Sequence, residues 1–312
     1  MQNLSQRVAY GDMLVEMGKE NESIVVLEAD LGKSTMSIFF QEQFPDRFFE
    51  MGIAEANMIS TAAGLSLTGK IPFASSFAVF ATGRPYDQIR TSVCIPNLNV
   101  KICGSSAGLS DFGDGSTHQS VDDITLMRVL PNMHVFSPVD AIETRKILRA
   151  MLEIEGPCYI RVNRNDLPIL TEDDQEPYRP GEVRLINKPG DITLIATGVM
   201  VSKGLEAAEK LAAEGISLGV YNLSTIKPIN KKSLLEALAG SKALITAEEH
   251  SVIGGMGSAI LETLSGDLNV PVSMIGINDQ FGTSGQNYDE LLNYYGLTAS
   301  AIAEAARKLV AK

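Results

Sequence analysis

Short apolar segments alternate with longer segments of helical periodicity through the first half of the chain. Apolar runs of about 4–8 residues are typical of buried strands, and strands separated by helices predict a mostly parallel sheet with helices on both faces. Ser5 is a suitable N-cap for the first helix. The expected strands are 23–30, 47–52, 72–77, 99–104, 133–138 and 158–162, and the expected helices are 5–20, a helix from 55 on, 83–94, 120–129 and 141–155.

A change of composition after Leu170 separates this block from a second one. Residues 171–190 are rich in charged side chains and prolines, which is typical of a linker. We therefore predict an α/β fold of two doubly wound domains with mostly parallel sheets, residues 1–170 and 191–312, joined by that linker. The second block has expected strands at 192–197, 216–222, 243–247 and 270–276, and expected helices near 200–214, 231–239, 255–265 and 298–310.

Composition narrows the class of protein further. The 312 residues are enough for two ordinary domains, and 45% hydrophobic with 21% charged residues is normal for a soluble globular protein. A net charge of −12 argues against binding to nucleic acid or to a membrane surface. No apolar run reaches the roughly 18 residues of a membrane-spanning helix, and the first residues lack a secretion signal, so we expect a cytoplasmic protein. Cys94, Cys103 and Cys158 form no close pair and are expected to be buried, reduced thiols.

An acidic residue opens the helix that is expected after the second strand. Glu55 follows a short apolar run and Gly52, and the residues after it are mostly Ala, Met, Ile and Leu. A carboxyl group there has little polar company, which favours its protonated form and suits a group that shares a proton with a ring nitrogen. On the residues alone, the alternative is a first-turn glutamate that complements the helix dipole.

The loop 108–120, GLSDFGDGSTHQS, is the strongest group of polar side chains. It places Asp111, Asp114, Thr117 and His118 among three glycines at the end of a predicted strand. A neutral imidazole can donate a hydrogen bond to an oxygen that gains charge during carbonyl addition. By spacing alone, a solvated turn is an equally good interpretation.

Four segments together resemble one enzyme family. MGIAEANM, SFAVF, YDQIR and DGSTHQSVDD are similar to segments in the pyrimidine-binding domain of transketolases and 1-deoxy-xylulose-5-phosphate synthases, which use thiamine diphosphate. The resemblance covers this chain from start to finish, but only the C-terminal half of those enzymes. It implies that Glu55 is the catalytic carboxylate that holds a nitrogen of the cofactor's aminopyrimidine ring. It also implies that Asp114 and His118 contact substrate oxygens, with His118 taking part in catalysis.

The resemblance gives functional roles to residues that otherwise have ordinary explanations. Phe80 and Phe77 resemble the aromatic residues that stack on the aminopyrimidine, although the sequence alone would place both in the core. Arg7, Ser34 and Arg164 resemble residues that bind the sugar phosphate, and arginine forks suit phosphate oxygens. Without the resemblance, the two arginines would form surface ion pairs and the serine would cap a helix.

Asp30 and the segment 247–260 are two further candidates for a functional site. Asp30 ends the predicted strand 23–30, where α/β sheets carry ligand sites, and the resemblance implies that it lies near the cofactor. The segment 247–260, AEEHSVIGGMGSAI, fits no zinc or dinucleotide pattern. It resembles a stretch of the family's C-terminal domain that has no catalytic residues, so we interpret it as structural and interfacial.

The chain departs from the family at two kinds of position. Ser106 stands where transketolases have a histidine, and Ala107 stands where the synthases have an arginine, so a phosphate anchor of both relatives is absent. The segment 113–115, Gly-Asp-Gly, begins like the diphosphate-binding signature of thiamine enzymes, but the asparagine that completes the signature is missing. We therefore expect no metal site in this chain.

The resemblance implies the C-terminal subunit of a split transketolase of the pentose phosphate pathway. Such a subunit would pass a two-carbon unit between sugar phosphates, together with an N-terminal subunit that holds the diphosphate and Mg²⁺, in an α2β2 heterotetramer. One alternative is a related synthase that uses pyruvate. A second is a non-catalytic regulatory remnant, against which the presence of Glu55, Asp114 and His118 together argues. A third is the β subunit of a branched-chain-type dehydrogenase.

Overall fold

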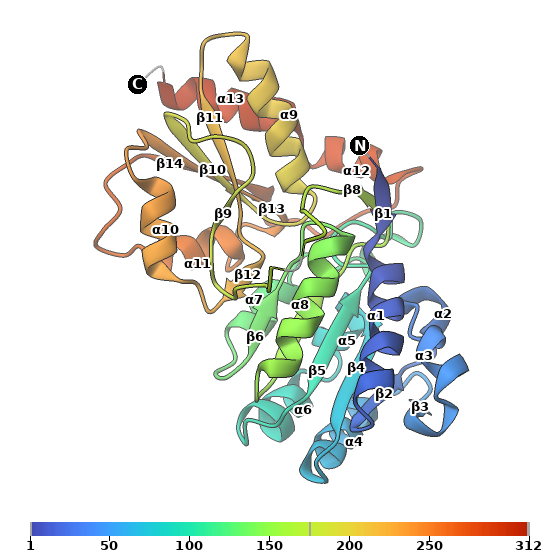
Figure 1. Ribbon diagram of the computed structural model, residues 1–312. Helices are drawn as coiled ribbons and strands as arrows, with labels where there is room; N and C mark the ends of the chain where they lie inside the picture. Colours follow the sequence, from blue (N-terminus) through green and yellow to red (C-terminus); the bar gives the residue numbers. More distant parts are fainter. Residues whose placement is uncertain (1, 175, 311–312) are drawn as a thin grey trace.

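Two twisted sheets, each with helices on both faces, lie one above the other in the computed structural model, which describes residues 2–174 and 176–310 (Figure 1). The first half of the chain forms most of the lower sheet, and the second half forms the upper sheet and the last strand of the lower one. This arrangement confirms the predicted α/β class with mostly parallel sheets. The boundaries at 170 and 191 stay a prediction, and Gln175 of the predicted linker lies outside the described residues.

The lower sheet has seven strands, and every neighbouring pair is parallel except the pair at one edge, β12 and β6. Strand β2, the neighbour of the edge strand β3, is buried at every position because helices cover both faces, as its unbroken apolar sequence predicts. In spatial order the strands are β12 (Thr225–Lys227), β6 (His134–Phe136), β7 (Cys158–Arg161), β5 (Lys101–Ser105), β4 (Ile71–Phe77), β2 (Ile24–Glu28) and β3 (Phe48–Glu50).

Two groups of helices cover the lower sheet. One group packs its apolar side chains with those of β2 and β7 into one core cluster and comprises α1 (Gln6–Glu20), α3 (Ile38–Gln43) and α8 (Ala141–Glu153). The other group packs on the opposite face and comprises α4 (Glu55–Leu67), α5 (Ala78–Gly83), the π-helical segment Ile89–Cys94 and α7 (Asp123–Arg128). The N-cap prediction is confirmed, since Ser5 Oγ accepts a hydrogen bond from the Val8 amide at 3.3 Å.

The prediction of a single helix at 83–94 is wrong. The segment instead forms α5, the short helix α6 (Tyr86–Gln88) and the π-helical segment. Pro85 lies between α5 and α6, and a proline has no amide hydrogen for the helical ladder. Several short elements were not expected from the sequence: β1 (Asn3–Ser5), α2 (Gly32–Thr35), β8 (Asp166–Pro168), β9 (Arg184–Leu185), β12 and α12 (Tyr288–Tyr294).

The upper sheet has five strands, of which β9 alone is antiparallel to its neighbour. Its spatial order is β14 (Val272–Ile277), β13 (Ala243–Ser251), β10 (Ile192–Ala196), β11 (Leu218–Asn222) and β9. One core cluster joins it to α9 (Met200–Ala212), α12 and α13 (Ala299–Val310). The helices α10 (Lys231–Leu238) and α11 (Met256–Thr263) belong to the cluster that also contains α4 and α7 of the lower half.

The two halves share backbone hydrogen bonds as well as apolar packing. Strand β12 comes from the second block of sequence but pairs with β6 of the lower sheet, with Thr225 opposite Phe136. The Ser137 amide donates to the Ser224 carbonyl at 2.7 Å, and Thr197 Oγ1 donates to the Ser137 carbonyl at 3.0 Å. The halves are therefore joined by a continuous seam.

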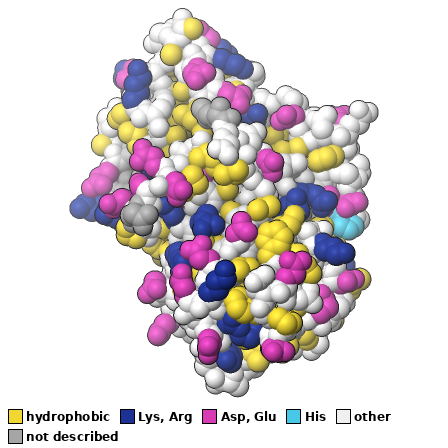
Figure 2. Space-filling view, turned by 45° about the vertical axis from the view of Figure 1, so that its right-hand side comes forward, with side chains coloured by type: hydrophobic (Ala, Val, Ile, Leu, Met, Phe, Trp, Pro, Cys, Tyr) yellow, Lys and Arg dark blue, Asp and Glu magenta, His cyan; other side chains and the backbone are white. Residues whose placement is uncertain are grey.

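Two further expectations concern side chains and membrane segments. Cys94, Cys103 and Cys158 are free and buried, as predicted. Among the described residues, no helix has the length and apolar character to cross a membrane. Figure 2 shows acidic and basic side chains interspersed over one face, with hydrophobic side chains in small patches between them.

Candidate active site

Glu55 lies in the first turn of α4, beyond the carboxyl end of β3. The chain turns at Gly52, whose φ of 67° favours glycine, and α4 begins shortly afterwards. Glu55 is 3% exposed, and its Oε1 accepts a hydrogen bond from Arg84 Nη1 at 2.6 Å. The expectation that this carboxyl has little polar company is wrong, because the fold brings a cation to it from the segment after α5.

Two phenylalanine rings and a histidine ring lie next to this ion pair. Phe77 ends β4 and Phe80 lies in α5, and their ring centroids are 6.1 Å apart with the planes inclined by 12°. The His118 ring meets Phe77 edge-on at 6.3 Å and Phe80 edge-on at 5.3 Å. The Arg84 guanidinium lies 4.1 Å from the centroid of Phe80 while it pairs with Glu55. The structure thus brings together four of the residues that the sequence singled out.

The loop that carries Asp114 and His118 is closed by backbone hydrogen bonds. Gly108 and Ser120 exchange two of them, at 2.9 and 3.1 Å. A short 3-10 turn follows Asp114, and the His118 amide donates to the Gly115 carbonyl at 2.9 Å. Asp114 is exposed and His118 is partly exposed, so both side chains are open to a molecule in solution.

Arg7, Ser34 and Arg164 lie together near Phe77. Arg7 Nη1 donates to the Ser34 carbonyl at 2.6 Å, and Arg7 Nε donates to the Arg164 carbonyl at 3.1 Å. Arg164 Nη1 pairs with Asp111 Oδ2 at 2.8 Å, and the Arg164 guanidinium lies 5.8 Å from the centroid of Phe77. Burial, and then the charge of Arg164, lower the pKa of Arg7. Two neighbouring guanidinium groups suit an anion such as a phosphate.

Asp30 lies beside the turn that precedes Glu55. Its φ is 62°, a left-handed conformation that aspartate tolerates better than most residues. Glu50 Oε1 accepts hydrogen bonds from the Asp30 amide at 2.8 Å and from the Gly52 amide at 2.9 Å. One carboxylate therefore ties Asp30 to the turn, with the Asp30 side chain exposed.

The two departures from the family lie at the carboxyl end of β5. Ser106 has a φ of 52°, and its buried Oγ has no hydrogen-bond partner among the described residues. Ala107 is 4% exposed, and its amide donates to the Val162 carbonyl at 3.1 Å. A hydroxyl and a methyl group cannot replace the charge of an anion anchor, so positive charge in this region comes from Arg7 and Arg164.

Sequence reasoning missed two members of this site. Arg84 pairs with Glu55, and the only signal for it was an arginine soon after the aromatic segment. Asp111 pairs with Arg164; its position in the polar loop was noticed, but no role followed from it. Within the described ranges, no group of three or more His, Cys, Asp or Glu side chains could hold a metal ion.

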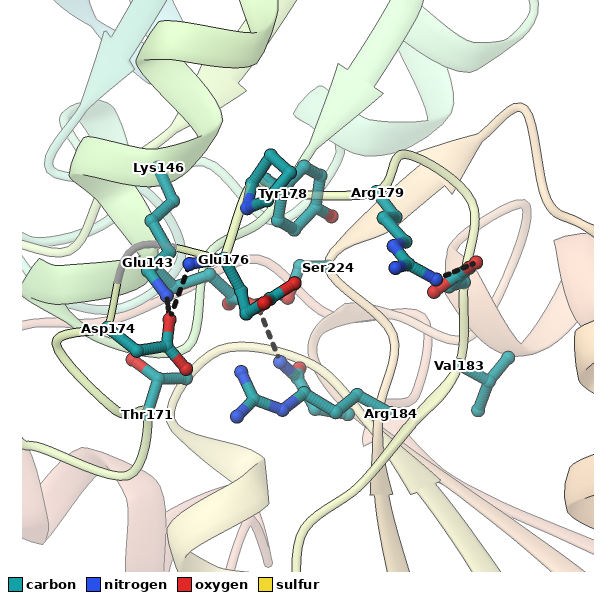
Figure 3. A pocket seen from close by; sticks show the side chains of 13 residues that line it. Glu143, Lys146, Thr171, Asp174, Glu176, Tyr178, Arg179, Val183, Arg184 and Ser224 are labelled. Atoms are coloured by element: carbon teal, nitrogen blue, oxygen red, sulfur yellow. Dashed lines mark hydrogen bonds and ion pairs between the residues drawn. The ribbon is translucent and has the colours of Figure 1, made fainter.

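A separate cavity of about 380 Å³ lies where the predicted linker crosses α8 (Figure 3). Lys146 and Asp174, which both line the cavity, form an ion pair, and the lining residue Glu143 accepts hydrogen bonds from Asn222 Nδ2 at 2.9 Å and from Ser224 Oγ. Among the described residues that line it, none is a predicted site residue. We place the candidate active site at Glu55 and His118, because the aromatic faces, the buried carboxylate and the arginine pair meet there.

Comparisons with known proteins show which family this chain belongs to. A sequence model of the transketolase pyrimidine-binding domain matches residues 2–169, and one of the transketolase C-terminal domain matches residues 181–302. A putative transketolase C-terminal section of Methanocaldococcus jannaschii is 45% identical over 300 residues, which cover 96% of this chain and 94% of that protein.

Longer relatives and solved structures agree with this match. Human transketolase is 34% identical over 313 residues, which cover 99% of this chain but 49% of the human protein. A solved split-gene transketolase, described as an inactive beta4 tetramer, is 47% identical, covers 99% of both chains and has a TM-score of 0.89. The chain therefore belongs to the transketolase family and corresponds to its C-terminal half, the pyrimidine-binding and C-terminal domains.

Proposed function

We propose that this chain is the C-terminal subunit of a split transketolase, which moves a two-carbon ketol unit from a ketose phosphate to an aldose phosphate with thiamine diphosphate. The observation that carries the proposal is the cluster of Glu55, Phe77, Phe80 and His118, with the pair Arg7 and Arg164 next to Phe77. A step of the pentose phosphate pathway in the cytoplasm is the setting we propose.

A separate N-terminal subunit is part of this proposal. The chain spans nearly all of a split-gene relative but about half of human transketolase, which supports a second chain as the source of the other half. That subunit would hold the diphosphate and Mg²⁺, and the two kinds of chain would form an α2β2 assembly.

The residues present fit the aminopyrimidine ring of the cofactor. The Arg84 guanidinium, a flat group with N–H donors, stacks on Phe80 and donates to Glu55. An aminopyrimidine ring is also flat, and in this place it would make the same two kinds of contact. The Arg84 side chain is 48% exposed, so it has room to leave this position.

The chemistry would be divided between cofactor and protein. Thiamine diphosphate, when bound, supplies the carbon nucleophile and the electron sink. Glu55 would hold a proton at the ring nitrogen, and Phe77 and Phe80 would stack on the ring, with Asp30 nearby. Asp114 would accept a hydrogen bond from a substrate hydroxyl, and His118 would donate one to the carbonyl oxygen as it gains charge.

Arg7, Arg164 and Ser34 would bind the sugar phosphate. The Arg7 guanidinium donates to the Ser34 and Arg164 carbonyls, and the Arg164 guanidinium pairs with Asp111. An arriving phosphate would therefore meet the positive charges of Arg7 and Arg164 side by side.

The test is a coupled assay on the chain alone and co-expressed with a transketolase N-terminal partner. Xylulose 5-phosphate with ribose 5-phosphate is offered in one arm, and pyruvate with glyceraldehyde 3-phosphate in the other. Ketol transfer that requires both chains is the expected result. Turnover in the pyruvate arm only would replace the proposal with the related synthase, the alternative within the family. A confirmed complex that is silent in both arms would reject the proposal for these substrates.

A binding measurement tests the division of the cofactor site between two chains. Most of the affinity should come from Mg²⁺ and diphosphate contacts in the partner, so the chain alone should bind thiamine diphosphate weakly in calorimetry. Binding at micromolar concentration or tighter by this chain alone would contradict the split site.

A further inference from the structure

The loop that carries Asp114 and His118 is held in place by residues of the second domain. Three hydrogen bonds join the loop to that domain, and a fourth joins the domain to Val121, the residue directly after the loop. They run from the Leu109 amide to Glu249 Oε1 at 2.7 Å, from the Gly285 amide to the Phe112 carbonyl at 2.9 Å, from Gln119 Nε2 to the Thr283 carbonyl at 3.0 Å, and from the Ser251 amide to the Val121 carbonyl at 2.8 Å.

Glu249 is the one side chain of the second domain in this set that accepts from the loop backbone. It lies in β13, is 5% exposed, and packs so closely on Gly108 that a Cβ there would lie 2.4 Å from its carboxyl carbon. The loop itself has no regular helix or strand beyond a single 3-10 turn. Its shape near Leu109 therefore depends on this carboxylate.

The second carboxylate oxygen of Glu249 reaches the turn that carries Arg164. Asn163 Nδ2 lies 3.4 Å from Glu249 Oε2 and donates to Tyr288 Oη at 2.7 Å. Asn163 Oδ1 accepts from the Asn165 amide at 2.8 Å, which closes the turn around Arg164. One carboxylate thus contacts both segments that meet in the Arg164–Asp111 ion pair.

We propose that Glu249, which lies in the second domain, is a positioning residue of the active site. It holds the loop of Asp114 and His118 in contact with the turn that carries Arg164. The proposal rests on the proposed function for its kinetic consequence. Glu249 touches neither Asp114 nor His118, so it acts through the backbone of the loop. This gives the second domain a part in the reaction, where the sequence indicated a structural segment only.

The neighbouring Glu248 provides a matched control. Both side chains are buried, and burial raises the pKa of each to about 7. Glu248, however, accepts hydrogen bonds from the Met256 and Gly257 amides at 2.6 and 2.8 Å and so begins α11. Shortening either residue to aspartate keeps the carboxyl group but withdraws it from its amide partner.

Hydrogen exchange on the full-length chain tests the contact directly. In Glu249→Asp, exchange of the amides in 108–119 should rise about tenfold, because the buried hydrogen bond from the Leu109 amide to the carboxyl group is lost. In Glu249→Gln, whose carbonyl can still accept from Leu109, exchange should stay within about twofold of wild type. Glu248→Asp should speed exchange at the start of α11 and leave 108–119 unchanged. Wild-type exchange of the loop in Glu249→Asp, or an equal rise in Glu248→Asp, would overturn the proposal.

Kinetics of the complex with the N-terminal partner test the consequence. Glu249→Asp should lower kcat about tenfold while the KM for the sugar phosphates and the affinity for thiamine diphosphate change little, and Glu249→Gln should restore most of kcat. A kcat of Glu249→Asp equal to that of wild type would overturn the positioning role and leave the proposed function intact. If the wild-type complex transfers no ketol unit, the proposed function fails, and the exchange experiment still decides whether Glu249 holds the loop.

Discussion

Replacing Asp123 by asparagine should destabilise the chain strongly. Asp123 is fully buried and accepts hydrogen bonds from Tyr159 Oη at 2.7 Å and from Arg161 Nε and Nη2 at 2.9 and 3.0 Å. The Arg161 side chain is 6% exposed. Asparagine removes the negative charge and leaves the guanidinium charge buried without its counter-ion.

The size of the effect follows from this burial. Removing one partner of a buried pair costs about 3–5 kcal/mol. For a cooperative unit of roughly 150–250 residues, each kcal/mol lowers the melting temperature by about 2–4 °C, so the expected fall is roughly 6–20 °C. Tyr159→Phe keeps the ion pair and loses one hydrogen bond, so its cost should be about 1 kcal/mol.

Differential scanning calorimetry on the full chain at one scan rate measures these shifts. Glu214→Gln is the control, since the Glu214–Arg307 pair has the same chemistry but both side chains are more than 40% exposed. This control should melt close to wild type because water screens an exposed pair. If Asp123→Asn melts no lower than Tyr159→Phe, the reasoning about an uncompensated buried charge is refuted.

Four further changes test other parts of the structure. Burial raises the pKa of Glu28 to about 7, so between about pH 4.5 and 7 the folded state binds more protons than the unfolded state, and the stability of the wild type falls as pH rises through that window. In urea unfolding, the stability of Glu28→Gln relative to wild type should therefore increase between pH 5 and 8, by up to about 3 kcal/mol. A difference in stability that stays constant with pH would contradict this. Gly108→Ala, at a φ of 66° against the Glu249 carboxyl, should lower ketol transfer by the complex about tenfold or more, and unchanged activity would count against a fixed loop. Gly64→Ala, in a helix with no atom within 4 Å of the new Cβ, should stabilise the chain by about 0.5–1 kcal/mol in the same unfolding assay, and a loss of stability would be unexpected. Glu55→Gln should leave the melting temperature near that of wild type and abolish turnover, and an active variant would remove the central assignment.

Much of the fold follows from local pattern. The predictions of strand β2 and helix α1 are confirmed. An unbroken apolar run indicates a buried strand in an α/β protein, and a capped amphipathic run indicates a helix. The three-residue strand β12 could not be predicted, because its partner β6 lies far away in the sequence and a strand so short has no periodicity to read.

The candidate site divides in the same way. The positions of Glu55 and His118 in the chain attract attention because of local composition and the resemblance to a family. The Arg84 contact to Glu55 and the Glu249 contact to Leu109 link residues 29 and 140 positions apart, so only the folded chain reveals them. The residues proposed to act in the reaction could thus be predicted from the sequence, whereas the contacts that hold them in place could not.

The pairing of β12 with β6 links the order of synthesis to the order of folding. A ribosome releases the other strands of the lower sheet well before Thr225–Lys227, so one edge of β6 stays unpaired until β12 has been synthesised. A shortened chain that ends in the predicted linker would keep that edge open and would be prone to edge-to-edge aggregation. An expression clone cut at 171–190 should therefore give less soluble protein than one that includes β12.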